Sequence, residues 1–69
     1  MPAVVKVIEI LAESTESWEA ATKVAVAEAA KTVRNIQNVY IESLKAIVED
    51  NQVVRYRVDA KITFIVEHK

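Results

Sequence analysis

Residues 53–67 read VVRYRVDAKITFIVE, a stretch in which apolar side chains recur at every second position. Most positions between them are charged or polar. Because successive side chains of a strand point to opposite faces, this alternation predicts one long strand with a dry face and a wetter face. We expect this strand at the centre of the sheet, with the rest of the chain packed on its apolar face. That face comprises Val54, Tyr56, Val58, Ala60, Ile62, Phe64 and Val66.

Two earlier segments are also rich in β-branched residues and predict strands. Residues 4–11 read VVKVIEIL, and residues 39–48 read VYIESLKAIV. Residues 49–52 (EDNQ) separate the second of these segments from the long strand. They predict a hairpin turn, because Asp50 and Asn51 tolerate the left-handed backbone conformation that such turns require.

A helix is expected between the first two strands, beginning at residues 13–17 (ESTES) and running to about Asn35. Ser14 or Thr15 is expected to accept hydrogen bonds from the free N–H groups of its first turn. Apolar and small side chains recur at three- and four-residue spacing and form one stripe. The stripe comprises Trp18, Ala21, Ala25, Ala29, Thr32, Val33 and Ile36. Its alanines let the helix lie close on the sheet, and Trp18 is interpreted as a packing anchor rather than a ligand-stacking residue.

The predicted order is strand, helix, strand, hairpin, strand within a single domain, residues 1–69. A helical connection favours a parallel relation between the first two strands, and a long strand between them is then antiparallel to both. The fold class is therefore α+β, a β-α-β-β chain whose three-stranded antiparallel sheet wraps around one helix. That helix covers only one face of the sheet. The uncovered face, with its apolar side chains, predicts self-association.

The composition excludes several classes of protein. The 69 residues contain no glycine and no cysteine, which excludes glycine-rich phosphate loops, disulfides and thiolate metal sites. The formal net charge of −1 gives no sign of nucleic-acid binding. No apolar run is long enough to span a membrane, and no signal-peptide layout is present, so we expect a cytoplasmic protein. The single histidine, His68, is expected to be solvated, and without a positioned general base we expect no enzymatic activity.

Several short stretches resemble the dodecin family in their order and spacing. They are Ile8-Glu9-Ile10, Ser14 before the helix, Ala20-Ala21, the helix end AAKTVR (29–34), and the last strand from Tyr56-Arg57-Val58 to Phe64. The resemblance covers residues 6–67 and rests on the combination of these stretches. It implies a hollow, roughly spherical homododecamer.

For most members the resemblance also implies two flavins stacked between tryptophans, with a glutamine of the last strand bonded to the ring edge. By position these two residues are Asn38 and Arg57 in this chain. An asparagine amide cannot supply the stacking of an aromatic face, and arginine donates hydrogen bonds but accepts none. We therefore expect the usual flavin sandwich to be absent. Tyr40, two residues from Asn38, is the nearby aromatic side chain that could stack on riboflavin or FMN in an altered mode.

The chain is also similar to a smaller branch of dodecins that lacks the tryptophan, carries arginine on the last strand, and has a helix start like Ser17-Trp18-Glu19. This resemblance implies calcium binding, and Ca²⁺ takes about six to eight oxygen ligands. The expected donors are the carboxylates of Glu9, Glu13, Glu16, Glu49 and Asp50, with Glu42, Asn51 and Asp59 as further donors. No spaced loop motif joins them. The alternative is that they are solvated or paired with Lys6, Arg55, Arg57 and Lys61.

Three hypotheses of function are left open. The first is an oligomeric binding or storage protein for a small ligand or a metal such as calcium, without the usual flavin pair. The second is flavin sequestration through Tyr40 and Arg57. The third is a structural assembly without a ligand. The expected partner is the chain itself in a homododecamer, with neither nucleic acid nor membrane.

Overall fold

The long strand predicted from residues 53–67 lies at the centre of a three-stranded sheet. The computed structural model describes residues 3–66. Its elements are β1 (Val4–Ser14), α1 (Trp18–Ala30), β2 (Ile36–Glu49) and β3 (Gln52–Val66). The strand order is β1-β3-β2, and both outer strands are antiparallel to β3. This arrangement confirms the predicted α+β topology.

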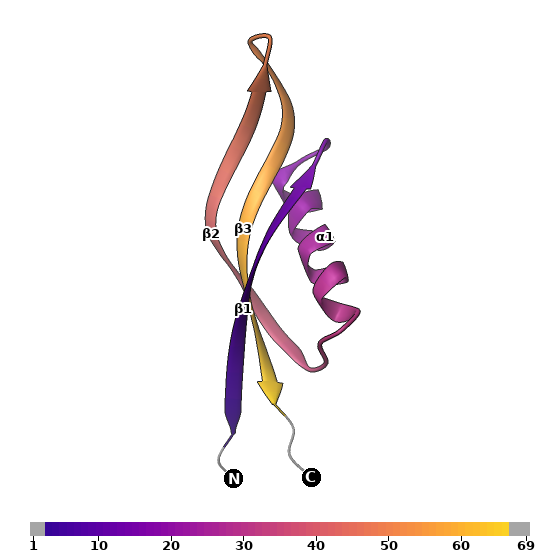
Figure 1. Cartoon of the computed structure of the whole chain (residues 1–69), viewed down its shortest axis with the longest axis vertical. Coiled ribbons are helices and arrows are strands. Elements are labelled where there is room, and N and C mark those ends of the chain that lie inside the picture. Colours follow the sequence, from indigo (N-terminus) through magenta and orange to yellow (C-terminus); the bar gives the residue numbers. More distant parts are fainter. Residues whose placement is uncertain (1–2, 67–69) are drawn as a thin grey trace.

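The molecule is elongated along its β2–β3 hairpin. The extents of the Cα trace are 53 × 19 × 13 Å. Figure 1 shows α1 running along one face of the twisted sheet, while the hairpin extends beyond both α1 and β1. β1 pairs with β3 only as far as Ser14 opposite Tyr56, whereas β2 continues to Glu49 opposite Gln52. The end of the hairpin is therefore a two-stranded ribbon.

The core lies between α1 and the apolar face of β3. Val58, Ala60 and Ile62 are fully buried, which confirms the predicted dry face. The buried residues that pack against them from β1 and α1 are Ala12, Ala21, Ala25 and Ala29. Because an alanine side chain ends at Cβ, the helix axis lies close to the sheet, and there is little space for a larger side chain at these positions.

The end of α1 differs from the prediction. The helix ends at Ala30 rather than near Asn35, so the last three residues of the predicted stripe lie outside it. The backbone N–H groups of residues 31–33 donate to the carbonyls of residues 28–29, which closes the last turn. Asn35 has a φ of 63°, a left-handed conformation through which no α-helix continues. The chain then enters β2 at Ile36.

The start of α1 also differs from the prediction. The helix begins at Trp18 and its N-cap is Ser17, rather than Ser14 or Thr15. The Ser17 hydroxyl accepts a hydrogen bond from the N–H of Ala20 at 2.9 Å, which is the usual cap contact. Ser14 instead ends β1, because that strand stays in register with β3 up to this residue.

The hairpin turn is confirmed, and the strands on both sides of it are longer than predicted. Asp50 and Asn51 have φ values of 52° and 63°, as the two central residues of a type I′ turn require. β2 spans Ile36–Glu49 instead of residues 39–48, because β3 offers partners along that whole length. Register shifts leave Gln37 and Glu42 of β2 and Val54 of β3 as extra residues. Such bulges increase the local twist.

The sheet face opposite α1 is uncovered, and we call it the open face. Several of its apolar side chains are exposed, among them Val5, Val7 and Leu11 of β1 and Tyr40 of β2. Leu11 lies opposite Asp59, and Tyr40 lies opposite Lys61, so these residues share the wetter face of β3. The predicted half-covered sheet is therefore present in the single chain.

The predicted end of the long strand at Glu67 and the predicted solvation of His68 both fall outside residues 3–66. Within residues 3–66, no helix has the length and apolar character needed to cross a membrane.

Candidate functional site on the open face

Side chains of all three strands meet in rows across the open face. In the order β1, β3, β2, these rows are Glu13, Arg57 and Lys45; Leu11, Asp59 and Ser43; and Glu9, Lys61 and Tyr40. Side chains that lie opposite or diagonally to one another on one sheet face are close enough to interact. The open face is therefore the place where the charged residues of the long strand find partners.

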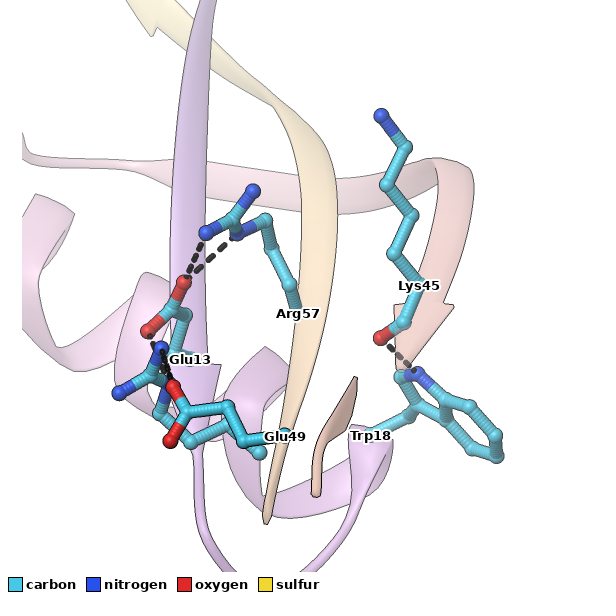
Figure 2. A network of polar contacts seen from close by, with 6 residues as sticks. Glu13, Trp18, Lys45, Glu49 and Arg57 are labelled. Carbon is cyan, nitrogen blue, oxygen red and sulfur yellow. Dashed lines mark hydrogen bonds and ion pairs between the residues drawn. The ribbon is translucent and has the colours of Figure 1, made fainter. Parts of the chain in front are cut away.

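Glu13 holds two arginines of β3 in one ion cluster (Figure 2). Arg57 Nε donates to Glu13 Oε2 at 2.6 Å, and Arg57 Nη2 contacts the same oxygen. Arg55 Nε lies 3.2 Å from Glu13 Oε1, close enough for an ion pair although its N–H makes no hydrogen bond. Arg55 Nη2 is 3.8 Å from Glu49 Oε2. We call these four residues the arginine cluster.

The arginine cluster includes Arg57, one of the residues expected from the family resemblance to contact a flavin. The side chains of Glu13 and Arg57 are 33% and 36% exposed, so their contact is only partly screened by water. Arg57 stands where the family resemblance places the flavin-contacting glutamine. Its guanidinium already has a carboxylate partner in the same chain, which takes Nε and Nη2.

Glu9 and Asp59 form a second polar group, which we call the carboxylate pair. A hydrogen bond between the two carboxyl groups, and the repulsion between their charges, raise the pKa of Glu9 above its ordinary value. Asp59 Oδ1 is buried and has no hydrogen-bond partner among residues 3–66. A proton or a cation at the pair relieves the repulsion between the two carboxylates.

Lys61, a cation next to the carboxylate pair, is held by another acid. Lys61 Nζ lies 2.8 Å from Glu42 Oε1, and this contact raises the pKa of Lys61 above its ordinary value. Lys61 also lowers the pKa of Glu9, but this effect is smaller than the effects of Asp59. Lys61 therefore offsets only part of the repulsion between Glu9 and Asp59.

A cavity of about 50 Å³ lies between the arginine cluster and the carboxylate pair. It is lined by Leu11, Ser43, Lys45, Arg57 and Asp59. Liquid water takes about 30 Å³ per molecule, and a drug-sized ligand needs a pocket of about 300 Å³ or more. One chain can therefore enclose only a small group here, and a larger ligand needs walls from a second copy.

The three residues predicted for a flavin contact do not meet within one chain. Asn38 and Tyr40 both lie on the open face, and Tyr40 is 59% exposed. Tyr40 is opposite Lys61, and Arg57 is further along β3 by roughly 13 Å at the usual rise of a strand. A ligand that touches Tyr40 and Arg57 together would therefore bridge two copies of the chain or span that distance.

The five carboxylates predicted as metal ligands also lie apart. Glu13 and Glu49 belong to the arginine cluster, and Glu9 belongs to the carboxylate pair. Glu16 follows β1 in the connection to α1, and Asp50 lies in the hairpin turn. Among residues 3–66, no group of three or more His, Cys, Asp or Glu side chains could hold a metal ion. A cation held by several carboxylates therefore needs ligands from more than one chain.

Sequence reasoning missed Leu11, Ser43 and Lys45 as neighbours of Arg57 and Asp59, and it did not pair Glu9 with Asp59. The alternation of residues 53–67 places Asp59 on the wetter face, and this is the only feature of the sequence that points to Asp59 as a site residue. The neighbours of Arg57 and Asp59 depend on the register in which β1 and β2 pair with β3. A shift between Ile41 and Ser43 in β2 decides which side chain faces Asp59, and nothing in the local sequence marks it.

Trp18 lies on the helix side of the sheet rather than at the open face. Its ring packs edge-on against Tyr56, with centroids 5.0 Å apart and an interplanar angle of 74°. Its Nε1–H donates to the backbone carbonyl of Lys45 at 3.0 Å, as Figure 2 shows. Both contacts join the start of α1 to the hairpin, in agreement with the interpretation of Trp18 as a packing anchor.

Comparison with known proteins identifies the architecture. The sequence model of the dodecin family matches residues 4–67. The chain belongs to the dodecin family. The resemblance to dodecins is thereby confirmed, and the match covers nearly the whole of this chain.

Solved structures share the fold of this dodecin. The tt0972 protein of Thermus thermophilus is 28% identical with a TM-score of 0.92, over 99% of this chain and 100% of that chain. A dodecin of Streptomyces coelicolor is 25% identical with a TM-score of 0.91, over 97% and 96%. The calcium dodecin of Mycobacterium tuberculosis, a calcium-chelating antigen with a novel calcium-binding site, is 31% identical with a TM-score of 0.80, over 88% and 87%. No curated protein sequence matches this chain.

Proposed function

We propose that this dodecin assembles as a hollow homododecamer and binds calcium where open faces of neighbouring copies meet, without the usual flavin sandwich. The observation that carries the proposal is the carboxylate pair of Glu9 and Asp59. It brings two carboxylates together on an uncovered surface, and the buried Oδ1 of Asp59 accepts no hydrogen bond from any group of residues 3–66.

Exposed apolar side chains support the assembly. Val5, Val7 and Leu11 lie on the open face of β1, and their exposures are 56%, 55% and 65%. Contiguous apolar surface of this kind marks contacts between proteins. Sedimentation is expected to give about twelve times the chain mass of 7.7 kDa, whereas a 7.7 kDa species would contradict the assembly.

The state of Arg57 argues against the usual flavin sandwich. Glu13 accepts from Arg57 Nε in a charge-assisted hydrogen bond, which is roughly twice as strong as a neutral one. The remaining N–H groups of Arg57 offer a flavin ring edge no acceptor, and Asn38 offers no aromatic face at the second contact position. The two principal flavin contacts of the family are therefore missing for independent reasons.

The chemistry of the carboxylate pair favours a hard divalent cation. Ca²⁺ binds about six to eight oxygen atoms, several of them from carboxylates, and one copy supplies two carboxylates at this position. Symmetry-related copies would supply the rest. The similarity to a calcium dodecin, with 31% identity over 88% of this chain, supports the same choice of ion.

The experiment is a thermal melt of the assembled protein in chelator and in rising concentrations of CaCl₂. A ligand that binds only the folded protein raises the melting temperature progressively with its concentration. We expect this rise for the wild type, and we expect Glu9→Gln and Asp59→Asn each to require at least about tenfold more calcium for the same rise. Glu19→Gln is the matched control, because Glu19 is an exposed acid on α1 that pairs with Lys23.

Several outcomes of this experiment would contradict the proposal. One is a melting temperature that does not respond to calcium although sedimentation shows an intact assembly. Another is a loss of response in Glu19→Gln equal to that in Glu9→Gln, since this would mean that calcium acts through general surface charge. A response to MgCl₂ as large as the response to CaCl₂ would also argue against a calcium site.

Tyr40 supports a second candidate function, the binding of riboflavin or FMN in an altered mode. Tyr40 is 59% exposed on the open face, so its ring is available to stack across a contact between copies. Titration of either flavin with the protein is expected to quench flavin fluorescence if this function is correct, and Tyr40→Leu is expected to abolish the quenching. No quenching in the wild type would leave calcium as the proposed ligand.

A further inference from the structure

A groove lies at the end of the molecule where β1 begins and β3 ends, on the sheet face that carries α1. Its volume is about 390 Å³, which falls within the range of about 300–1,000 Å³ for ligand pockets. The polar residues of its lining include Lys6, Thr32 and Arg34, and the apolar ones include Val33, Phe64 and Val66. We call it the terminal groove. It is separate from the open face and from the carboxylate pair.

The floor of the terminal groove is apolar because α1 stops before it covers the end of the sheet. Phe64 and Val66 continue the apolar face of β3, but the helix ends at Ala30. Val33, in the segment after the helix, forms part of the opposite wall. These three side chains remain partly exposed, as does Ile65, which also lines the groove. This surface suits the apolar body of a ligand.

The charge of the terminal groove is positive. Lys6 lies opposite Phe64 on β1, and Arg34 lies in the segment between α1 and β2. Both side chains are exposed, and within residues 3–66 no ion pair involves either of them. No aspartate or glutamate of the described residues lines the groove. By contrast, Arg57 and Lys61 on the open face have carboxylate partners.

We propose that the terminal groove binds an amphiphilic anion. Its anionic head group contacts Lys6 and Arg34, and its apolar chain lies on Phe64 and Val33. Guanidinium and ammonium groups both form charge-assisted hydrogen bonds with carboxylate and phosphate oxygens, and the Thr32 hydroxyl is a further donor at the same wall. The shared chemistry is an anion on an apolar chain, and the head group is a carboxylate or a phosphate.

The cations of the terminal groove also have a structural alternative. They lie near the C-terminal end of α1, where the helix dipole favours positive charge. If that is their only role, removing them lowers stability and leaves ligand binding unchanged or absent. The test therefore measures binding itself, and the melting temperature is only a check on folding.

The experiment is calorimetric titration of the assembled protein with decanoate and with decyl phosphate, each kept below the concentration at which it forms micelles. A chelator is present, so that calcium on the open face plays no part. Decanol, which has the same chain without charge, is the control ligand. Lys6→Gln with Arg34→Gln is the test variant, and Lys23→Gln with Lys31→Gln is the matched control because both lysines are exposed cations on or next to α1.

The wild-type protein is expected to bind at least one anion saturably. Its affinity for that anion is expected to be about tenfold or more weaker in the test variant and unchanged in the control variant, and its affinity for decanol is expected to be about tenfold or more weaker than for the anion. The tighter of the two anions assigns the head group as carboxylate or phosphate. The proposal is overturned if neither anion binds, if decanol binds as tightly as the anions, or if the control variant loses as much affinity as the test variant. Calcium-dependent melting is expected to be the same in the test variant, which separates this site from the open face.

Discussion

Glu13 of β1 and Arg57 of β3 lie directly opposite each other, and Arg57 Nε donates to Glu13 Oε2 at 2.6 Å. The two residues are 44 positions apart in the sequence. Arg57 is the residue that the family resemblance predicts in place of a flavin-contacting glutamine, and the neighbouring strand of the same chain holds it. If that correspondence is correct, an arginine at this position also brings Glu13 next to the flavin position.

This relationship predicts how flavin binding can be restored. The double variant Asn38→Trp with Arg57→Gln is expected to create or improve riboflavin binding, because it supplies the stacking face and the mixed donor and acceptor. Adding Glu13→Gln is expected to strengthen binding further, since it removes a carboxylate left without Arg57. Quenching of riboflavin fluorescence measures both steps. If neither variant quenches, the placement of the flavin position on Asn38 and Arg57 is wrong.

The raised pKa of Glu9 predicts a pH dependence of stability. The folded protein keeps the Glu9 proton to a higher pH than the unfolded chain, whose glutamate pKa is about 4.5. Over the window that begins near pH 4.5 and ends above the raised pKa, the folded state binds more protons, so stability falls as the pH rises. Glu9→Gln is expected to remove this component.

Melting temperatures of the wild type and Glu9→Gln, measured at one protein concentration from pH 4 to pH 7.5, test this pH dependence. The difference between the two proteins is expected to change across the window in favour of the variant. Glu19→Gln again serves as the control. A constant difference between wild type and Glu9→Gln over the whole range would show that the carboxylate pair does not bind an extra proton on folding.

Calcium binding is expected to have the opposite pH dependence. Ca²⁺ binds ionised carboxylates, so it competes with the proton that Glu9 retains. The calcium-induced rise in melting temperature is therefore expected to be larger at pH 7.5 than at pH 4.5. A rise that is equal at both pH values would mean that the bound ion does not use Glu9.

The packing of α1 predicts the effect of a larger side chain in the helix. Ala25 has no exposed surface and faces the buried residues of β3. Ala25→Leu is expected to lower the free energy of unfolding by about 1–3 kcal/mol, because the added atoms push the helix from the sheet. Ala27→Leu is the matched control, since Ala27 is exposed on the same helix. Denaturant unfolding of both variants makes the comparison, and equal effects would contradict this account of the core.

Trp18 offers a fifth prediction, on the link between α1 and the hairpin. Trp18→Phe keeps an aromatic edge near Tyr56 but removes the hydrogen bond from Nε1 to the Lys45 carbonyl. The expected cost is about 0.5–1.5 kcal/mol, the usual range for one such bond. Trp18→Ala is expected to cost more, because it also removes the ring contact. Far-UV circular dichroism can follow unfolding without the tryptophan, and equal costs for the two variants would mean that the ring contributes nothing.

The helix and the strands could be predicted wherever the backbone geometry itself sets the spacing of the apolar side chains. Side chains of a strand alternate between faces regardless of what they contact, so residues 53–67 predicted the buried side chains of Val58 and Ile62. The alanine stripe around Ala25 likewise predicted the helix face on the sheet. Asp50 and Asn51 predicted the hairpin, because few other residues adopt two left-handed conformations in succession.

The element ends and the partners on the open face depended on the tertiary structure. α1 ends at Ala30 because the chain turns back toward β3, although the helical spacing continues in the sequence to Ile36. Glu13 could be read as a solvated acid or a calcium ligand until the register of β1 placed it opposite Arg57.

The sequence by itself determined the fold class, the central strand, the dry face and the family, because these follow from backbone periodicity and from short stretches in a set order. Only the tertiary structure decided which charges neutralise one another and which remain available. Glu13 has arginine partners, and Glu9 lies beside the like-charged Asp59. Lys6 has no ion-pair partner within residues 3–66. The physical reason is that electrostatic interactions depend on distance through space, and strand register sets that distance between residues far apart in the chain.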